Sequence, residues 1–505
     1  MSNSTKADTE AVNTKTPENV KQDNRQVDDT SHPSIVWFRS DLRVKDNPAL
    51  TAAVMRGNPI ICIYILEESE RKRGGASEWW LHQSLSSLEK SLAEIGGTLV
   101  LRSGAAGHIL DCIISETSAD HVFWNRRYDA DGMGTDKNLK LSLRAQSVDV
   151  SSFKANVLFE PWEIEKNSGG FYKVYTPYKR ACLAKGVARG PLAAPDKITS
   201  AKTTKSETLD TWKLTPTEPN WAKPIAQSWE PGETGAVEKL VRFLHEGGID
   251  GYTVNRNMPA LDGTSQLSPH LAFGEISPYQ IWSAATAPDV DAPSGDLETF
   301  LSEILWREFS YQLLYFNPQL ASENFQARFD AFPWQKNDAL LRKWQTGQTG
   351  YPIVDAGMRQ LWQTGWMHNR VRMIVGSFLV KHLLLDWRHG EKWFWDTLVD
   401  ADPASNAASW QWIAGSGADA APYFRVFNPM TQGDKFDKSG DYVRKFVPEL
   451  KDLPNKHLNS PWEAPECVLQ SAGVELGKTY PKPIVDHATA RKKALSAFAE
   501  TKETA

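Results

Sequence analysis

The chain has 505 residues, of which 41% are hydrophobic and 24% charged, a composition typical of a soluble globular protein with two or three domains. The formal net charge of −5 argues against bulk, non-specific binding to nucleic acid. The four cysteines lack the spacing of a metal site or a disulfide framework, and no run of about eighteen apolar residues predicts a membrane span. We therefore expect a cytoplasmic protein with no bound metal.

Residues 1–33 are polar and predict a disordered N-terminal tail. From residue 34 to 160, short apolar runs alternate with amphipathic helical patterns, which predicts a Rossmann-like α/β domain with a parallel sheet. The expected strands are 34–38, 58–66, 98–101 and 121–124, and the expected helices are 48–56, 78–95 and 106–118.

Residues 161–234 lose this periodicity and are rich in Pro, Thr, Lys and Ser, which predicts a long interdomain connector. Residues 235–487 predict an all-α domain. Its helical patterns lie at 236–246, 278–285, 297–316, 338–346, 353–364, 369–385 and 390–398. Residues 488–505 are polar, and we expect them to form a frayed C-terminal tail.

A hydroxyl-rich segment at 262–270 contains Thr264, Ser265 and Ser268. Ser268 followed by Pro269 predicts a helix start, with the serine as N-cap and the proline at the first helical position. Hydroxyls and free backbone N–H groups at a helix N-terminus suit a phosphate. An ordinary capping loop explains the same pattern.

The predicted helix at 297–316 places Glu303, Trp306, Arg307 and Ser310 at i, i+3, i+4 and i+7, and therefore on one face. An acid, a large aromatic ring and a guanidinium on one stripe could line a polar pocket for a flat base. An exposed ion pair beside a core tryptophan is the alternative.

Residues 365–373 begin the next predicted helix and place Trp366, Asn369 and Met373 on one stripe, flanked by Arg370 and Arg372. A buried amide among apolar groups needs a hydrogen-bond partner. Either a ligand with carbonyl and N–H edges or a neighbouring core residue would provide it.

The segment from Asp400 to Trp412 is rich in small residues and predicts a loop in which the backbone can approach a ring system. Its carboxylates could accept hydrogen bonds from a ribose or a ring N–H. Most of the 20 tryptophans of the chain are expected in helical cores, although a few could form an electron-hopping row to the surface.

Together these segments resemble the photolyase/cryptochrome family. The resemblance begins with residues 36–43 and Asp46-Asn-Pro48, runs with gaps from 34 to 487, and is densest from 350 to 433, where it includes 349–361, 366–373 and 419–429. It implies an α/β antenna-binding domain at 34–160 and a helical FAD-binding catalytic domain at 235–487.

The resemblance also implies the site residues. The flavin would be contacted by Tyr252, Thr264, Ser265, Gln266, Leu267, Ser268, Phe300, Trp366, Arg372, Asp400, Ala401, Asp402 and Asn406. Damaged DNA would be contacted by Arg256, Glu303, Trp306, Arg307, Asn369, Arg370, Met373, Trp412 and Gln432. Trp410, Trp387 and Trp334 match the photoreduction chain of the family, with Trp410 nearest the flavin.

The activity that the resemblance implies is repair of cyclobutane pyrimidine dimers, a lyase reaction in which photoexcited reduced FAD passes an electron to the dimer. Glu303 would stabilise the resulting charge on a thymine carbonyl, and Trp306 and Trp412 would pack on the flipped-out dimer. Asn406 matches the residue facing flavin N5, and asparagine there resembles photolyases, whereas plant cryptochromes typically carry aspartate. We expect a monomer whose partner is UV-damaged DNA.

Two related activities are alternatives. A (6-4) photolyase would have a histidine pair where this chain has Asn369 and Arg370, and a cryptochrome would be a blue-light receptor without repair activity.

The antenna chromophore is predicted to be methenyltetrahydrofolate, with a deazaflavin as the alternative. Residues 74–82 resemble the bacterial class III branch, which uses this folate, and Trp79 and Trp80 would either stack a pterin or belong to a helix core. Residues 125–132 resemble the antenna region of the family. Asp131 and Gly132, however, stand where the best-known folate-binding photolyases have asparagine and glutamate.

Overall fold

The structure is a computed structural model that describes residues 32–505 except 69–70, 203–204, 420–423 and 504–505. Nearly all of the expected N-terminal tail, residues 1–33, lies outside the described residues. Within the described part of the chain, no helix combines the length and apolar character needed to cross a membrane.

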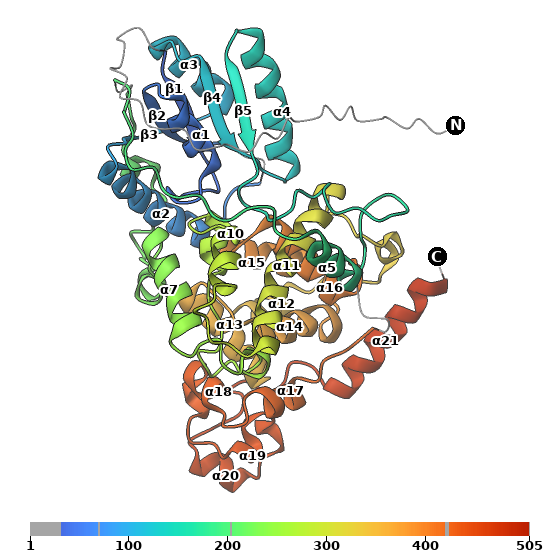
Figure 1. The fold of residues 1–505 in the computed structure, drawn as a ribbon. Helices are drawn as coiled ribbons and strands as arrows, with labels where there is room; N and C mark the ends of the chain where they lie inside the picture. The colour runs from blue at the N-terminus through green and yellow to red at the C-terminus, as the bar shows by residue number, and fades with distance from the viewer. Residues whose placement is uncertain (1–31, 69–70, 203–204, 420–423, 504–505) are drawn as a thin grey trace. The chain divides into compact units, whose positions relative to one another are not determined.

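A five-stranded parallel sheet forms the first part of the described chain (Figure 1). Its strands, in the spatial order β3-β2-β1-β4-β5, are β1 (Ser34–Phe38), β2 (Ile60–Leu66), β3 (Leu99–Ser103), β4 (His121–Asn125) and β5 (Asp149–Phe153). The helices between them are α1 (Pro48–Arg56), α2 (Gly75–Glu94), α3 (Ala106–Thr117) and α4 (Ala130–Ala145). The expected Rossmann-like fold class is confirmed.

Both faces of the sheet are covered, because its strands are apolar on each side. Val36 and Phe38 of β1 belong to one apolar cluster with α1 and α2, whereas Ile35 and Trp37 belong to another with α3 and α4. β5 and α4 were not expected from the sequence. β5 is a half-exposed strand at the edge of the sheet, and α4 contains two glycines and many polar residues, so neither shows a strong apolar pattern.

The rest of the chain is helical (Figure 1). The connector carries α5 (Tyr175–Lys185) and α6 (Lys223–Ser228). The helices that follow are α7 (Glu233–His245), α8 (Tyr252–Asn255), α9 (Ser268–Phe273), α10 (Pro278–Ala285), α11 (Ser294–Phe316), α12 (Asp338–Gln345), α13 (Pro352–Thr364), α14 (Asn369–Ser377), α15 (Trp387–Thr397), α16 (Pro403–Ala414), α17 (Pro429–Phe436), α18 (Asp441–Phe446), α19 (Asn455–Leu458), α20 (Glu466–Ser471) and α21 (His487–Glu503).

Three segments differ from the expectations. The segment from Asp400 to Trp412, expected to be a loop, contains helix α16, whose first turn begins at Pro403. The helix expected at 369–385 ends as an α-helix at Ser377 and continues as a π-helical turn over Phe378–His382. The expected frayed tail forms α21, because three alanines, Ala490, Ala494 and Ala497, give it a buried apolar face.

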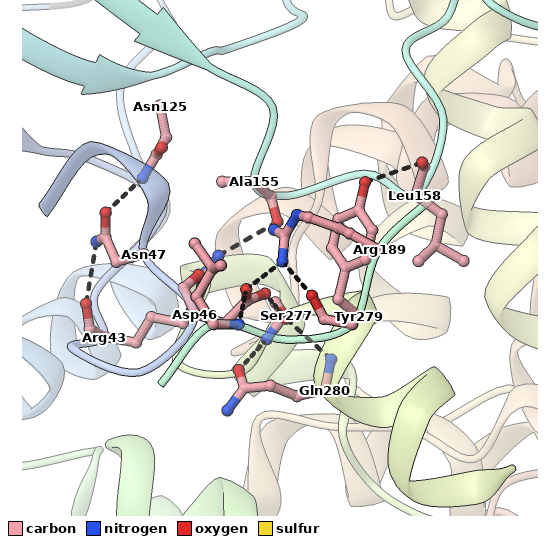
Figure 2. A network of polar contacts seen from close by, with 12 residues as sticks. Arg43, Asp46, Asn47, Asn125, Ala155, Leu158, Arg189, Ser277, Tyr279 and Gln280 are labelled. Atoms are coloured by element: carbon pink, nitrogen blue, oxygen red, sulfur yellow. Dashed lines mark hydrogen bonds and ion pairs between the residues drawn. The ribbon is translucent and has the colours of Figure 1, made fainter. Parts of the chain in front are cut away.

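A buried polar network joins the sheet to the helical part of the chain (Figure 2). The Arg43 guanidinium is fully buried and donates to the backbone oxygens of Gly274 at 2.8 Å and Ala155 at 3.2 Å. Asp46 accepts from Ser277 Oγ and from Arg189 Nη1, each at 2.5 Å. Arg43 and Asp46 belong to the first motif of the family resemblance. Their hydrogen bonds show that this motif has a structural role: it connects the α/β part of the chain to the helical part.

Candidate functional site

The residues matched to flavin contacts come from separate segments that converge around α16. They lie in α8, before and at the start of α9, in α11, around α14, and at the start of α16. Because α16 packs directly against α11, α14 and α15, residues more than a hundred positions apart share one region.

Asp400 is the centre of a polar cluster in this region. Its Oδ2 accepts a hydrogen bond from Arg372 Nη2 at 2.7 Å and another from Ser268 Oγ at 2.6 Å. Trp366 Nε1 donates to the same serine oxygen at 3.3 Å. Asp400 Oδ1 is buried and has no hydrogen-bond partner among the described residues. A buried, unused acceptor of this kind fits a ligand that offers a hydroxyl or N–H donor.

The prediction that Ser268 is the N-cap of its helix is wrong. Leu267 occupies the N-cap position of α9, so Ser268 and Pro269 are the first two helical residues. The Ser268 hydroxyl instead donates to Asp400 Oδ2.

The segment that precedes α9 combines hydroxyls with a cation that the sequence reasoning missed. Thr264 and Ser265 are half-buried, and Gln266 has a positive φ of 51°. Gln266 Oε1 accepts a hydrogen bond from Lys239 Nζ at 3.1 Å. Lys239 lies on α7, where one lysine among other charged residues gives no signal in the sequence. Hydroxyls beside a lysine suit the phosphates of a nucleotide.

Asp402 and Asn406 organise the first turns of α16. Asp402 Oδ1 caps the helix by accepting from the backbone N–H groups of Ala404 and Ser405, and Oδ2 accepts from the Tyr311 hydroxyl at 2.6 Å. Aspartate followed by proline is a helix-start signal, which is the physical reason that the expected loop is a helix.

Asn406 is held by a buried glutamate. Its Nδ2 donates to the backbone oxygen of Glu391 at 3.0 Å and to Glu391 Oε1 at 2.9 Å, so both amide hydrogens are used and Oδ1 remains for a ligand. Burial raises the pKa of Glu391, although Arg71 lies 2.5 Å from its carboxylate and opposes that shift. Neither Glu391 nor Arg71 was predicted, because they are far from Asn406 in the sequence.

These features fit a flavin nucleotide. Asp400 offers an unused acceptor, Asn406 an oriented amide oxygen, and the segment before α9 offers hydroxyls beside Lys239. Apolar walls come from Leu267, Phe300 and Ala401, each of which belongs to or packs on an apolar cluster. Tyr252 also lies here, packed edge-on against Phe300 with ring centroids 5.7 Å apart.

Glu303 and Trp306 lie together on α11, as predicted. Glu303 forms an ion pair with Arg256 at 2.8 Å, and burial raises its pKa despite the arginine. Trp306 stacks on Tyr175 of the connector, with ring centroids 3.6 Å apart and planes 9° apart.

Two other residues of this stripe face elsewhere. The Arg307 guanidinium is nearly buried and donates to the backbone oxygen of Asn156 at 2.7 Å. Ser310 Oγ donates to the backbone oxygen of Trp306, within the same helix. The structure therefore does not bring Arg307 together with Glu303 and Trp306.

The segment around α14 departs from the predicted stripe. The helix begins at Asn369 with His368 as its N-cap, so Trp366 lies before it and does not share its face. Asn369 is exposed, whereas the hypothesis of an amide in an apolar pocket required it to be buried. Arg370 donates to Asn257 Oδ1 at 2.5 Å and lies 3.6 Å from the Met373 sulfur.

His368 is a buried neutral group between these residues. Burial, together with the nearby Arg370 and Arg372, lowers the pKa of His368 to about 3. Of the remaining DNA-matched residues, Gln432 lies half-buried on α17, and Trp412 donates from Nε1 to the backbone oxygen of Asp419 at 3.1 Å.

The three tryptophans matched to photoreduction belong to one apolar cluster. Trp410 is buried, and its ring lies so close to α15 that a Cβ added to Gly390 would be 2.1 Å from Trp410 Cη2. Trp387 is the first residue of α15 and is fully buried. Trp334 is half-buried, and its neighbour Gln335 donates to the backbone oxygen of Leu384, three residues before Trp387. Of the three rings, Trp410 and Trp387 are buried and Trp334 is partly exposed.

Trp79 and Trp80 do not offer a pterin site in this structure, because both are buried. Trp80 packs against Trp229, His270 and Phe273, and its Nε1 donates to Glu275 Oε1 at 2.9 Å. Its faces are therefore occupied by the core of the protein.

The second antenna-like segment begins at the carboxyl end of β4. There, Arg127 pairs with Glu67 and, at 3.1 Å, with Asp136. Asp129 caps α4 by accepting from the Gly132 backbone N–H at 2.8 Å, while Asp131 is exposed.

Comparison with known proteins places this geometry in a family. Residues 34–196 match the DNA photolyase family, and residues 300–500 match the FAD binding domain of DNA photolyase. A deoxyribodipyrimidine photo-lyase from Agrobacterium fabrum is 57% identical over 94% of this chain and 98% of its own length. Cryptochrome-1 from Arabidopsis thaliana is 39% identical over 91% of this chain and 69% of its own length.

A solved structure agrees over almost the whole chain. The crystal structure of a bacterial class III photolyase from Agrobacterium tumefaciens aligns with a TM-score of 0.92 at 55% identity, covering 95% of this chain and 100% of that chain. Sequence and fold agree, and the chain therefore belongs to the photolyase/cryptochrome family as an enzyme of the photolyase type with an FAD-binding helical domain.

Proposed function

We propose that this protein repairs cyclobutane pyrimidine dimers in DNA under blue light. The observation that carries the proposal is that Glu303, Trp306 and Trp412 are tied to one another through Tyr175 and Asp419, on the helices that also carry the flavin-matched residues. When bound, photoexcited reduced FAD would supply an electron to the dimer, and the electron would return to the flavin once the two bonds of the cyclobutane ring have broken. The deoxyribodipyrimidine photo-lyase from Agrobacterium fabrum supports this choice of lesion.

The residues of the chain have separate roles in this proposal. Asn406 would help to hold the flavin through Oδ1, because Glu391 accepts hydrogen bonds from its amide nitrogen. Glu303, whose pKa is raised by burial, would hydrogen-bond a pyrimidine carbonyl and stabilise the charge that develops there. Arg256, now paired with Glu303, would turn to a phosphate of the DNA backbone when the flipped-out bases enter.

Trp306 and Trp412 would pack on the two bases, with Met373 beside them. Asn369 and Arg370 lie at the start of α14, where they would contact the lesion and the strand. Gln432 on α17 would contact the DNA backbone. We propose that Trp410, Trp387 and Trp334 relay electrons from an external reductant, such as a thiol, to the flavin and so restore its reduced state.

The kinship with plant cryptochromes favours blue-light reception as a second candidate. Two features of this chain argue against it: Asn406 in place of the aspartate typical of plant cryptochromes, and the lesion residues described above. A (6-4) photolyase is disfavoured because Asn369 and Arg370 stand where that branch has its histidine pair.

The test uses FAD-loaded, fully reduced protein and two oligonucleotides, one with a cyclobutane thymine dimer and one with a (6-4) photoproduct. We expect light-dependent restoration of the first only, with none in the dark. E303A is the matched variant, and we expect its repair yield to fall while its FAD content is unchanged. Repair of the (6-4) oligonucleotide alone, or of neither, would overturn the proposal.

We also propose methenyltetrahydrofolate as the antenna, on the class III kinship. The buried positions of Trp79 and Trp80 mean that these two residues give no support to it. Protein purified with its native chromophores is expected to absorb near-ultraviolet light as a folate does, and a band at longer, visible wavelength, as a deazaflavin gives, would favour the alternative. We further propose that the protein acts as a cytoplasmic monomer on UV-damaged DNA, which sedimentation of the free protein and of its DNA complex would check.

A further inference from the structure

Tyr175 lies outside every set of residues matched to flavin or DNA, yet it contacts several of them. It is the first residue of α5, in the connector, and only 7% of its surface is exposed. Its ring lies on the Trp306 ring at 3.6 Å and almost parallel to it, so one face of that tryptophan is already covered by protein. Only the opposite face of Trp306 can receive a base.

The Tyr175 hydroxyl fixes the same helical turn. It donates to the backbone oxygen of Ser302 at 2.7 Å. In an α-helix this oxygen is also the acceptor for the backbone N–H of Trp306, four residues later, and Ser302 immediately precedes Glu303. The phenol and its hydroxyl therefore hold the turn that carries both Glu303 and Trp306.

The backbone of Tyr175 reaches the second tryptophan. Its N–H donates to Asp419 Oδ2 at 3.1 Å, and the backbone oxygen of Asp419 accepts from Trp412 Nε1 at 3.1 Å. Asp419 adopts a positive φ of 53°, which directs its carboxylate and its carbonyl to different partners. One tyrosine is thus joined to Trp306 directly and to Trp412 through a single residue.

We propose that Tyr175 is a positioning residue for lesion binding, which holds Trp306 and Trp412 in the orientation that receives a flipped-out pyrimidine dimer. This inference rests on the proposed function. A tryptophan that is already oriented loses less side-chain entropy on binding, so the affinity for the lesion depends on the stacked ring. Affinity for undamaged DNA does not depend on this ring, because contacts to the backbone phosphates dominate that affinity.

The test measures dissociation constants in the dark, with FAD-loaded protein and two duplexes that differ only in one cyclobutane thymine dimer. Y175L and Y175M fill the space of the tyrosine without a flat ring. We expect either variant to bind the damaged duplex roughly fivefold to tenfold more weakly than wild type, from the loss of one aromatic pair. Binding to the undamaged duplex is expected to be unchanged.

Two further variants separate positioning from a general structural effect. Y175F keeps the stacked ring and loses only the hydroxyl, so it should retain most of the wild-type preference for the damaged duplex over the undamaged one. Y172L is the matched control, because Tyr172 is an aromatic residue of the same connector that packs on Tyr178 and not on Trp306. Its preference for the damaged duplex should equal that of wild type. Absorbance at the flavin band and the thermal midpoint are measured for every variant.

The outcomes distinguish this inference from the proposed function. If wild type does not prefer the damaged duplex, the proposed function fails. If wild type prefers it and the FAD-loaded Y175L or Y175M shows the same preference, the role of Tyr175 fails alone. Equal losses for damaged and undamaged duplexes, or a Y175F defect as large as that of Y175L, would also overturn it. If neither ring-less variant retains FAD, the effect of Tyr175 is a general structural one, and its role as a positioning residue for lesion binding fails.

Discussion

Glu308 allows a quantitative prediction about the pH dependence of stability. It is fully buried on α11, and its Oε2 accepts from the backbone N–H groups of Leu158 at 2.8 Å and Phe159 at 3.1 Å. Its Oε1 is buried without a hydrogen-bond partner among the described residues. Burial raises the pKa of Glu308 from 4.5 to about 7, and the nearby Arg307 only partly offsets this.

The sign of the effect follows from proton linkage. Between pH 4.5 and pH 7 the folded protein retains a proton on Glu308 that the unfolded chain has lost. The free energy of unfolding therefore decreases as the pH rises through this range, and the contribution is fully lost above it. A shift of this size corresponds to about 3 kcal/mol, at roughly 1.4 kcal/mol for each pKa unit.

The perturbation is E308Q, which is neutral at every pH. The glutamine oxygen can accept from the same two N–H groups, while its amide nitrogen replaces Oε1, which lies 3.5 Å from Arg307 Nη1, at a constant cost of about 1–3 kcal/mol relative to the protonated glutamate. The difference in unfolding free energy between wild type and E308Q should therefore change by about 3 kcal/mol between pH 5 and pH 8, in favour of the variant at pH 8.

Equilibrium denaturant unfolding of the FAD-loaded proteins at pH 5, 6, 7 and 8 measures this difference. E298Q is the matched control, because Glu298 is an exposed carboxylate on the same helix, paired with Lys179 at 2.9 Å. Its curve should run parallel to that of wild type over the same range. Parallel curves for wild type and E308Q would refute the reasoning, since they would mean that Glu308 is already ionised in the folded protein at pH 5.

Three further predictions concern other buried groups. N406D places a carboxylate against the Glu391 carboxylate and backbone oxygen, so unfolding free energy should fall by roughly 2–4 kcal/mol at pH 8 and by less at pH 5, as denaturant unfolding would show. G390A puts a methyl group 2.1 Å from Trp410 Cη2; we expect slower flavin photoreduction in flash absorption and a loss of about 1–3 kcal/mol of stability. Burial lowers the pKa of Lys381 from 10.5 to about 7, so wild-type stability should rise from pH 7 toward pH 10, and the pH profile of K381M should lack this rise.

The fold was largely predictable because its apolar patterns are strong. β1, α1 and α10 have the bounds that the sequence predicted, since buried runs and Pro-containing helix starts mark their ends. β5 and α4 were missed because a half-exposed edge strand and a polar helix bury too little to leave a pattern. α16 was missed for a different reason: its small residues suggested a loop, although Asp402 and Pro403 carried a helix-start signal.

The site was predictable only where it coincides with motifs of the family. Asp400, Arg372 and Ser268 were named from the sequence, and the structure joins them by hydrogen bonds. Glu391 and Tyr175 were not named from the sequence. Glu391 contacts Asn406, and Tyr175 stacks on Trp306, only because tertiary packing brings separate segments together. The sequence pattern of one helix also cannot show which of its polar side chains points away from the site, as the Arg307 side chain does.

The connector illustrates why such residues escape sequence reasoning. Its lack of periodicity predicted a linker, but its polar groups bond along the length of α11. Gln312 Nε2 donates to the backbone oxygens of Pro161 and Ile164, and the Tyr175 hydroxyl donates to the Ser302 oxygen. Glu308 accepts from the Leu158 and Phe159 N–H groups, which directly precede the connector. Backbone groups that have no sheet or helix partner must be satisfied elsewhere, and here α11 satisfies them. An aperiodic segment can therefore pack along a helix and place a residue such as Tyr175 against the proposed lesion-binding tryptophan Trp306.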